Sequence, residues 1–141
     1  MIARRRALGL VLFLLGTALA QAGCGGDRYI VVGTAKAPSV SGWVVLEDDE
    51  ITVHLEQLHP ASALDPSLHA YVVWFDSGAN SGHGAAKRAG SLKYRPDERT
   101  GELRAKSPLG KFVVKVTAEA NDKPAAPSDF LVASQELTLE N

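Results

Sequence analysis

Alternation of apolar and polar side chains is the dominant pattern of this chain. Apolar residues recur at every second position over most of three segments, residues 51–57 (ITVHLEQ), 111–119 (KFVVKVTAE) and 131–139 (LVASQELTL). A period of two is typical of a strand that buries one face. Residues 71–76 (YVVWFD) are apolar on both faces and predict a central strand. Weaker strand patterns occupy residues 29–35, 42–47, 89–95 and 102–106.

About eight short strands with turn-forming residues between them predict an all-β protein, a single antiparallel β-sandwich. The turn segments are residues 47–50 (EDDE), 95–101 and 121–128. The chain lacks the cysteine pair of a standard immunoglobulin domain, and an immunoglobulin-like or transthyretin-like topology stays open. The residues that we expect in the core are Ile51, Val53, Leu55, Val73, Phe112, Val114, Val116, Leu137 and Leu139.

A long uncharged run precedes this region. Residues 7–20 (ALGLVLFLLGTALA) follow the cationic cluster Arg4, Arg5 and Arg6. A helix needs about twenty apolar residues to cross a bilayer, so this run is short for a span. It matches the apolar region of a signal peptide behind its positive segment. The sequence therefore predicts a signal peptide over residues 1–23 and export from the cytoplasm.

Residues 21–24 (QAGC) resemble the lipobox of bacterial lipoproteins, in which the cysteine is lipidated and becomes the new N-terminus. Ala22, Gly23 and Cys24 match that motif, while Gln21 stands where the family usually has an aliphatic residue. Cys24 is the only cysteine, so the chain forms no internal disulfide, and lipidation accounts for the odd cysteine. The resemblance implies a diacylglycerol and an amide-linked acyl chain, and two or more chains give stable anchoring.

These features divide the chain into a signal peptide (residues 1–23), a lipidated N-terminus with a short tether (24–28) and a β-sandwich domain (29–141). We expect membrane attachment through the lipid on Cys24, at the outer membrane or cell surface. The alternative is cleavage after Ala20, which leaves a free thiol and a periplasmic or secreted protein. Removal of residues 1–23, with three arginines and no acid, changes the formal charge from −1 to −4. That mild acidity argues against a nucleic acid partner.

Four histidines, His54, His59, His69 and His83, raise the question of a metal site. None of them has the spacing from which a zinc site is recognised. His54 falls on the polar face of its strand, where we expect a solvated side chain. His59 and His69 flank one loop with room for a helical turn and could approach each other. We find no G-x-S-x-G elbow and no phosphate-binding loop, and predict no catalytic residue, metal or cofactor.

Two further features are candidates for binding. Trp43 and Trp74 lie in strand patterns, where core packing is expected and a sugar-stacking platform is the alternative. The loop of residues 77–86 (SGANSGHGAA) follows the central strand, and loops at the ends of sandwiches often carry function. Its candidate binding residues are Gly78, Asn80, Ser81 and His83, and the alternative is a tolerated surface insertion.

Residues 70–139 are similar to the extracytoplasmic C-terminal domain of anti-sigma-K factors. The matching motifs are a Tyr-x-x-Trp strand (residues 71–74), Ala-Gly-x-hydrophobic (89–92), Val-Thr-x-Glu (116–119) and a turn with Pro124 and Pro127. The resemblance implies a β-sandwich. The chain has no sigma-binding domain and no spanning helix of that family, so the resemblance does not carry sigma-factor binding with it.

The function indicated by the sequence is that of a non-enzymatic cell-envelope lipoprotein, a β-sandwich module that binds a protein partner or serves a structural role. The alternative is a small-ligand or carbohydrate-binding module that uses Trp43 or Trp74. A metal-dependent activity built on the histidines is a third hypothesis.

Lipidation predicts a specific labelling result. Cells given labelled palmitate should incorporate it into the wild-type protein, and the Cys24→Ser variant should lose the label because the acceptor thiol is gone. Equal labelling of both proteins, or a mature N-terminus at Gln21, would contradict the lipid anchor.

Overall fold

The computed structural model describes residues 26–77, 86–108 and 110–139, and it confirms the all-β prediction. These residues form nine strands and one short helix. In chain order they are β1 (Asp27–Val32), β2 (Ser41–Glu47), β3 (Glu50–Glu56), α1 (Ala61–Leu64), β4 (Ala70–Asp76), β5 (Lys87–Ser91), β6 (Lys93–Arg95), β7 (Thr100–Lys106), β8 (Gly110–Glu119) and β9 (Leu131–Leu139).

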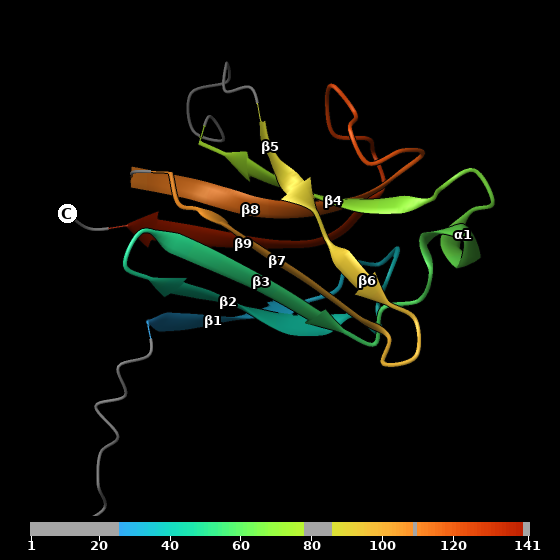
Figure 1. Ribbon diagram of the computed structural model, residues 1–141, viewed down its shortest axis with the longest axis horizontal. Helices are drawn as coiled ribbons and strands as arrows, with labels where there is room; N and C mark the ends of the chain where they lie inside the picture. The colour runs from blue at the N-terminus through green and yellow to red at the C-terminus, as the bar shows by residue number, and fades with distance from the viewer. Residues whose placement is uncertain (1–25, 78–85, 109, 140–141) are drawn as a thin grey trace, which may run out of the picture.

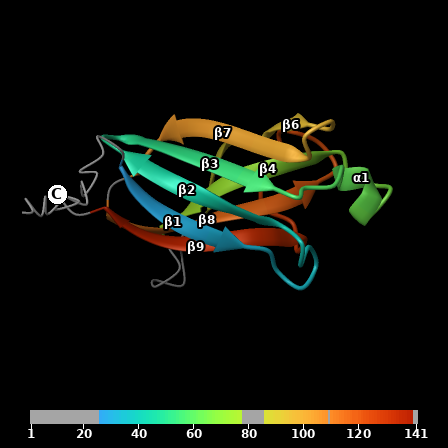
Figure 2. The same cartoon turned by 90° about the horizontal axis from the view of Figure 1, so that it is seen from below.

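The strands form two antiparallel sheets packed face to face (Figures 1 and 2). Sheet A has the order β1-β2-β3-β7-β6, and sheet B has the order β5-β4-β8-β9. β4 lies between two strands, as its apolar residues on both faces predict. β1 begins, and β9 ends, at the end of the sandwich opposite α1 (Figure 1).

The core lies between the sheets and contains the alternating residues that the sequence predicts. Eight of the nine predicted core residues are no more than 2% exposed. The ninth, Leu139, belongs to β9, but its side chain lies outside the described residues. Phe75 and Phe112 meet edge to face, with ring centroids 5.6 Å apart, which is a favourable aromatic geometry.

The segment of residues 89–95 was expected to form one strand, and this expectation is wrong. The chain runs as β5 in sheet B, crosses at Leu92 and continues as β6 in sheet A. Gly90 has a φ of +152°, a backbone conformation that side-chain-bearing residues rarely adopt. Leu92 is buried, and its N–H donates to the carbonyl of Tyr71 at 2.9 Å. This crossing joins the two sheets and accounts for nine strands in place of about eight.

The turn predicted at residues 47–50 and the helical turn between His59 and His69 are both present. β2 and β3 are joined through Asp48 and Asp49, and Asp48 has a φ of 54°, in the left-handed region that aspartate tolerates. The loop between His59 and His69 contains the one-turn helix α1. Within the described residues, no helix has the length and apolar character needed to cross a membrane.

The outer face of sheet B is partly covered by the connection between β8 and β9 (residues 120–130). This connection starts at the end of β8 and reaches β5, where Arg88 donates to the carbonyl of Pro124 at 2.8 Å. Ser91 donates to the carbonyl of Asp122 at 3.0 Å. Because β4 lies between β8 and β5, the connection crosses β4 and accounts for the burial of Val72 and Trp74 on that face.

Truncation of one core side chain should measure the importance of this packing. Leu137 is 1% exposed, so we expect Leu137→Ala to lower the free energy of unfolding by about 2–4 kcal/mol. The neighbouring Thr138 is exposed, and Thr138→Ala should change the free energy by less than about 0.5 kcal/mol. Urea denaturation of the two variants measures both values, and equal effects would contradict the assigned face of β9.

Candidate functional site

The outer face of sheet A carries an aromatic cluster that the sequence did not predict. Trp43 on β2 stacks on the imidazole of His54 on β3, with ring centroids 4.3 Å apart and an angle of 21° between the planes. The guanidinium carbon of Arg28 on β1 lies 4.9 Å from the centroid of the indole ring. The prediction of Trp43 as a core residue is therefore wrong, because Val44 and Leu46 are the inward-facing residues of β2.

His54 is held by two carboxylates as well as by the indole. Its Nδ1 lies 3.3 Å from Oε2 of Glu102 on β7, and its Nε2 lies 3.5 Å from Oε1 of Glu56. The imidazole side chain is only 18% exposed, which is less than we expect for a solvated histidine on a polar face. The Trp43 ring provides the cover, since it packs directly on the imidazole.

The alternative role of the tryptophans as sugar-stacking platforms finds little support. Trp74 is 1% exposed and donates from its indole N–H to Thr117 Oγ1 at 2.8 Å. Thr117 in turn donates to Oε2 of the buried Glu119, which also accepts the Ser128 N–H. Trp43 contacts neighbours on the two strands that flank β2, so its ring faces are not free.

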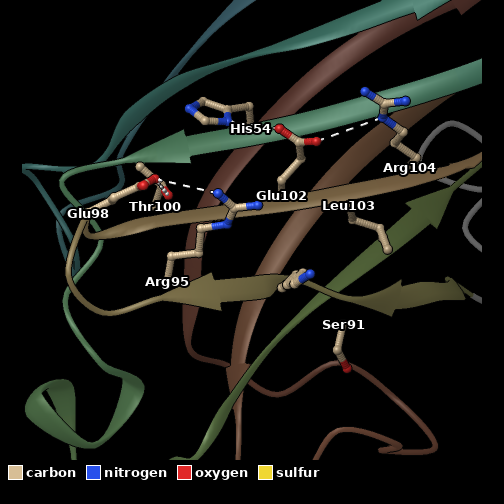
Figure 3. A pocket seen from close by; sticks show the side chains of 9 residues that line it. His54, Ser91, Arg95, Glu98, Thr100, Glu102, Leu103 and Arg104 are labelled. Carbon is tan, nitrogen blue, oxygen red and sulfur yellow. Dashed lines mark hydrogen bonds and ion pairs between the residues drawn. The ribbon is translucent and has the colours of Figure 1, made fainter.

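A hollow of about 320 Å³, lined mainly by charged and polar residues, opens on sheet A beside the point where the chain crosses from β5 to β6 (Figure 3). Lys93 and Arg95 of β6 and Glu102, Leu103 and Arg104 of β7 line most of it. The remaining lining residues are His54, Ser91, Glu98 and Thr100. Strands far apart in the sequence thus meet at one site, which no local motif could have indicated.

The opposite edge of sheet A presents an apolar surface. Ile30 and Val32 on β1 are 67% and 69% exposed, and they are the exposed large hydrophobic residues among those that the structure describes. They lie on the outer face, because Val31 between them is buried in the core. The sequence pattern predicted a strand here but did not show that one apolar pair faces solvent.

The other candidate residues from the sequence are only partly placed. Cys24 and the candidate loop residues Gly78, Asn80, Ser81 and His83 lie outside the described residues. His59 and His69 are exposed, at the two ends of the connection that holds α1. Over the described part of the chain, no three His, Cys, Asp or Glu side chains are grouped so that they could hold a metal ion.

Two tyrosine hydroxyls hold the connection around α1 through hydrogen bonds to its backbone. Tyr71 donates its hydroxyl to the carbonyl of His59 at 2.6 Å, and Tyr94 donates to the carbonyl of Leu58 at 2.8 Å. Burial raises the pKa of Tyr71 well above its usual value near 10, and the neighbouring Tyr94 adds to the shift. Burial also raises the pKa of Tyr94, while Arg99 opposes that shift. Both hydroxyls act as structural hydrogen-bond donors.

Comparison with known proteins adds no identification. No protein-family model matches the chain, and comparisons with curated proteins and with solved structures gave no significant match. The similarity of residues 70–139 to anti-sigma-K domains therefore stays a prediction.

The tyrosine pair predicts a loss of stability at high pH. Tyrosine in the unfolded chain loses its proton near pH 10, whereas the folded protein keeps Tyr71 protonated to higher pH. The contribution is fully present below pH 10, and the free energy of unfolding falls as the pH rises above that value. Tyr71→Phe should reduce this fall, and Tyr94→Phe should reduce it less because Tyr94 is less buried. Urea denaturation between pH 8 and about 11 tests this, and identical slopes in wild type and Tyr71→Phe would contradict it.

Proposed function

We propose that this protein is a non-enzymatic cell-envelope lipoprotein that binds a protein partner through strand β1. The observation that carries the proposal is the exposed pair Ile30 and Val32 on an edge strand. Contiguous exposed apolar side chains on a soluble domain mark interaction surfaces. Val45 of β2 is partly exposed and lies on the same face, next to the aromatic cluster around Trp43, which extends this surface across β2.

The backbone of β1 is suited to adding a further strand. The Gly33 N–H donates to the carbonyl of Val40 at 2.7 Å, in register with the β1–β2 ladder. Amide groups in an antiparallel ladder point alternately toward and away from the partner strand. Those of Arg28, Ile30 and Val32 therefore point away from β2. In the described part of sheet A, no strand forms a ladder with β1 on that side. Directly after β1, however, Gly33 forms a single bridge with Ala133 of β9, and the Thr34 N–H donates to the carbonyl of Val132 at 2.9 Å. The edge open to a partner is therefore the one from Arg28 to Val32.

The other three sheet edges carry protective features that the second half of β1 lacks. β6 has only three residues, two of them Lys93 and Arg95, and Pro96 follows directly. β5 carries Lys87 and Arg88 and faces an irregularity in the β4 ladder. β9 has the charged Glu136 at its centre. Charges, prolines, bulges and short length are the means by which proteins block unwanted strand pairing. The second half of β1, Ile-Val-Val, has none of them.

A partner that fits this edge is an extended segment of an envelope protein with β-branched or other apolar residues at alternate positions. Its backbone would pair with the outward amides of β1, and its side chains would pack beside Ile30 and Val32. The proposed lipid on Cys24 would also place β1 among envelope proteins, since only Gly25 and Gly26 separate that residue from β1. Three residues reach about 10 Å, so a lipid on Cys24 would hold the start of β1 close to the membrane. Helix α1 lies at the opposite end of the sandwich (Figure 1).

A non-enzymatic role agrees with the engagement of the polar groups in the described core. The buried Glu119 accepts hydrogen bonds from Thr117 and Ser128. The hydroxyls of Tyr71 and Tyr94 donate to backbone carbonyls. Catalysis needs a nucleophile or base aimed at a substrate, with a partner that orients it. These groups are instead committed to holding connections in place.

Site-specific crosslinking tests the proposed surface. A photoreactive residue at position 30 should give an adduct with another envelope protein in living cells, and the same residue at the exposed position 138 on sheet B should not. Val32→Lys should abolish the position-30 adduct, because a lysine on an edge strand opposes pairing. Val32→Thr, which keeps a β-branched side chain, should retain it.

Both substitutions at Val32 should leave the melting temperature nearly unchanged, since the side chain is 69% exposed. An adduct that persists undiminished in Val32→Lys, or the absence of any adduct at position 30, would contradict binding at this edge. An adduct between two copies of this chain would replace the proposed partner with self-association.

A further inference from the structure

We propose that the hollow beside β6 binds a sugar acid, that is, a saccharide unit carrying a carboxylate. This is a second site, at the edge of sheet A opposite to β1. It is separate from the edge of β1, because Ile30 and Val32 do not line the hollow.

The shape of the hollow follows from the crossing at Leu92. β6 pairs with β7 only as far as Glu102. From Leu103 onward β7 has no partner on the β6 side, because the residues that precede β6 belong to β5 in sheet B. The gap leaves Leu103 of β7 as an apolar floor, with Ser91 on the far side (Figure 3). A volume of about 320 Å³ is at the lower end of the range for small-molecule sites. One or two sugar units are of suitable size.

Three cations surround this floor and are only weakly neutralised. Arg95 lies 3.9 Å from Glu98, and Arg104 lies 3.8 Å from Glu102, with side chains about half to two-thirds exposed. Ion pairs at such distances in solvent contribute little and are readily exchanged for another anion. Lys93 stands opposite Glu102 in the ladder, yet it makes no ion pair with a described residue. A carboxylate bound in the hollow would be attracted by all three cations, since Lys93, Arg95 and Arg104 line it.

The two glutamates decide which kind of anion fits. Glu102 and Glu98 would repel a compact, highly charged ligand such as phosphate, but they accept hydrogen bonds from hydroxyl groups. The oxygens of Ser91 and Thr100 add further polar contacts around the rim. One carboxylate for the cations, hydroxyls for the glutamates and a C–H face for Leu103 together describe a sugar acid.

One wall of the hollow is held in place by packing. His54 contacts Glu102 at 3.3 Å and is itself stacked on Trp43. Glu102 is thus positioned by its contact with His54. A carboxylate that is positioned before binding loses less freedom when a ligand hydroxyl donates to it.

Calorimetric titration of the purified protein with two trisaccharides tests the site. The probes are the galacturonic acid trimer, which carries carboxylates, and maltotriose, which is neutral and of equal length. We expect binding of the acidic trimer alone, weakening as salt is raised. Lys93→Gln and Arg95→Gln should each reduce the affinity about fivefold, since each removes one charge-assisted contact at a partly solvated site.

Lys111→Gln is the matched control. Lys111 is similarly exposed, but it pairs with Glu136 at 2.7 Å on the outer face of sheet B, whereas β6 belongs to sheet A. Its affinity for the acidic trimer should equal that of the wild type. Equal binding of both trimers, no binding of the acidic one, or the same loss in Lys111→Gln would overturn the assignment. Crosslinking at position 30 is unaffected by any of these results, so the two proposals fail separately.

Discussion

The apolar layer between the two sheets determines where every other side chain lies. It is built from alternate residues of strands such as β3 and β8, where Val53 and Val114 are each 1% exposed. With Cys24 as the only cysteine, the sandwich has no internal disulfide to hold it, and packing carries this role. Since the side-chain period of a strand is two, fixing Val31, Val44 and Val53 inward forces their neighbours outward. Ile30, Trp43 and His54 face solvent for this reason.

The outer faces of the two sheets differ in how far other segments of the chain cover them. On sheet B, the connection of residues 120–130 crosses β4 and buries Val72 and Trp74. Its anchor is the chain of hydrogen bonds from Trp74 through Thr117 and Glu119 to Ser128. A buried carboxylate is costly unless it is hydrogen-bonded, and here it is. In the described part of the chain, no such connection crosses the outer face of sheet A, where Ile30 and Val32 are exposed.

The two edges of sheet A differ in chemistry. At one edge, β1 offers outward amide groups and two β-branched side chains, which suit an extended polypeptide. At the other edge, the three-residue β6 leaves a hollow with cations, carboxylates and an apolar floor, which suits a small polar ligand. Trp43 and His54 stack on each other on the strands between these edges, and Arg28 of β1 lies over the indole ring. The two proposed sites thus lie at opposite edges of the same sheet.

Local pattern was sufficient for the fold class, most of the strands and the core. The period of two placed Ile51, Val53, Leu55 and Phe112 inside, and the acidic tetrapeptide at residues 47–50 marked the β2–β3 turn. These features depend on neighbours in the sequence, which is why the sequence alone determined them. The arginines, the apolar run and Cys24 likewise predict export and anchoring from local chemistry.

Tertiary structure decided the features that join distant residues. The stretch around Trp43 (GWVVLE) is apolar on both faces, so only pairing with β1 and β3 shows that the indole points outward. The crossing at Leu92 depends on two sheets competing for one segment, which periodicity does not show. The hollow unites His54 with residues 91–104, and the hydrogen bonds under residues 120–130 unite Trp74 with Glu119. Side chains separated by tens of residues meet only after the strands have paired, so no local signal in the sequence could place them together.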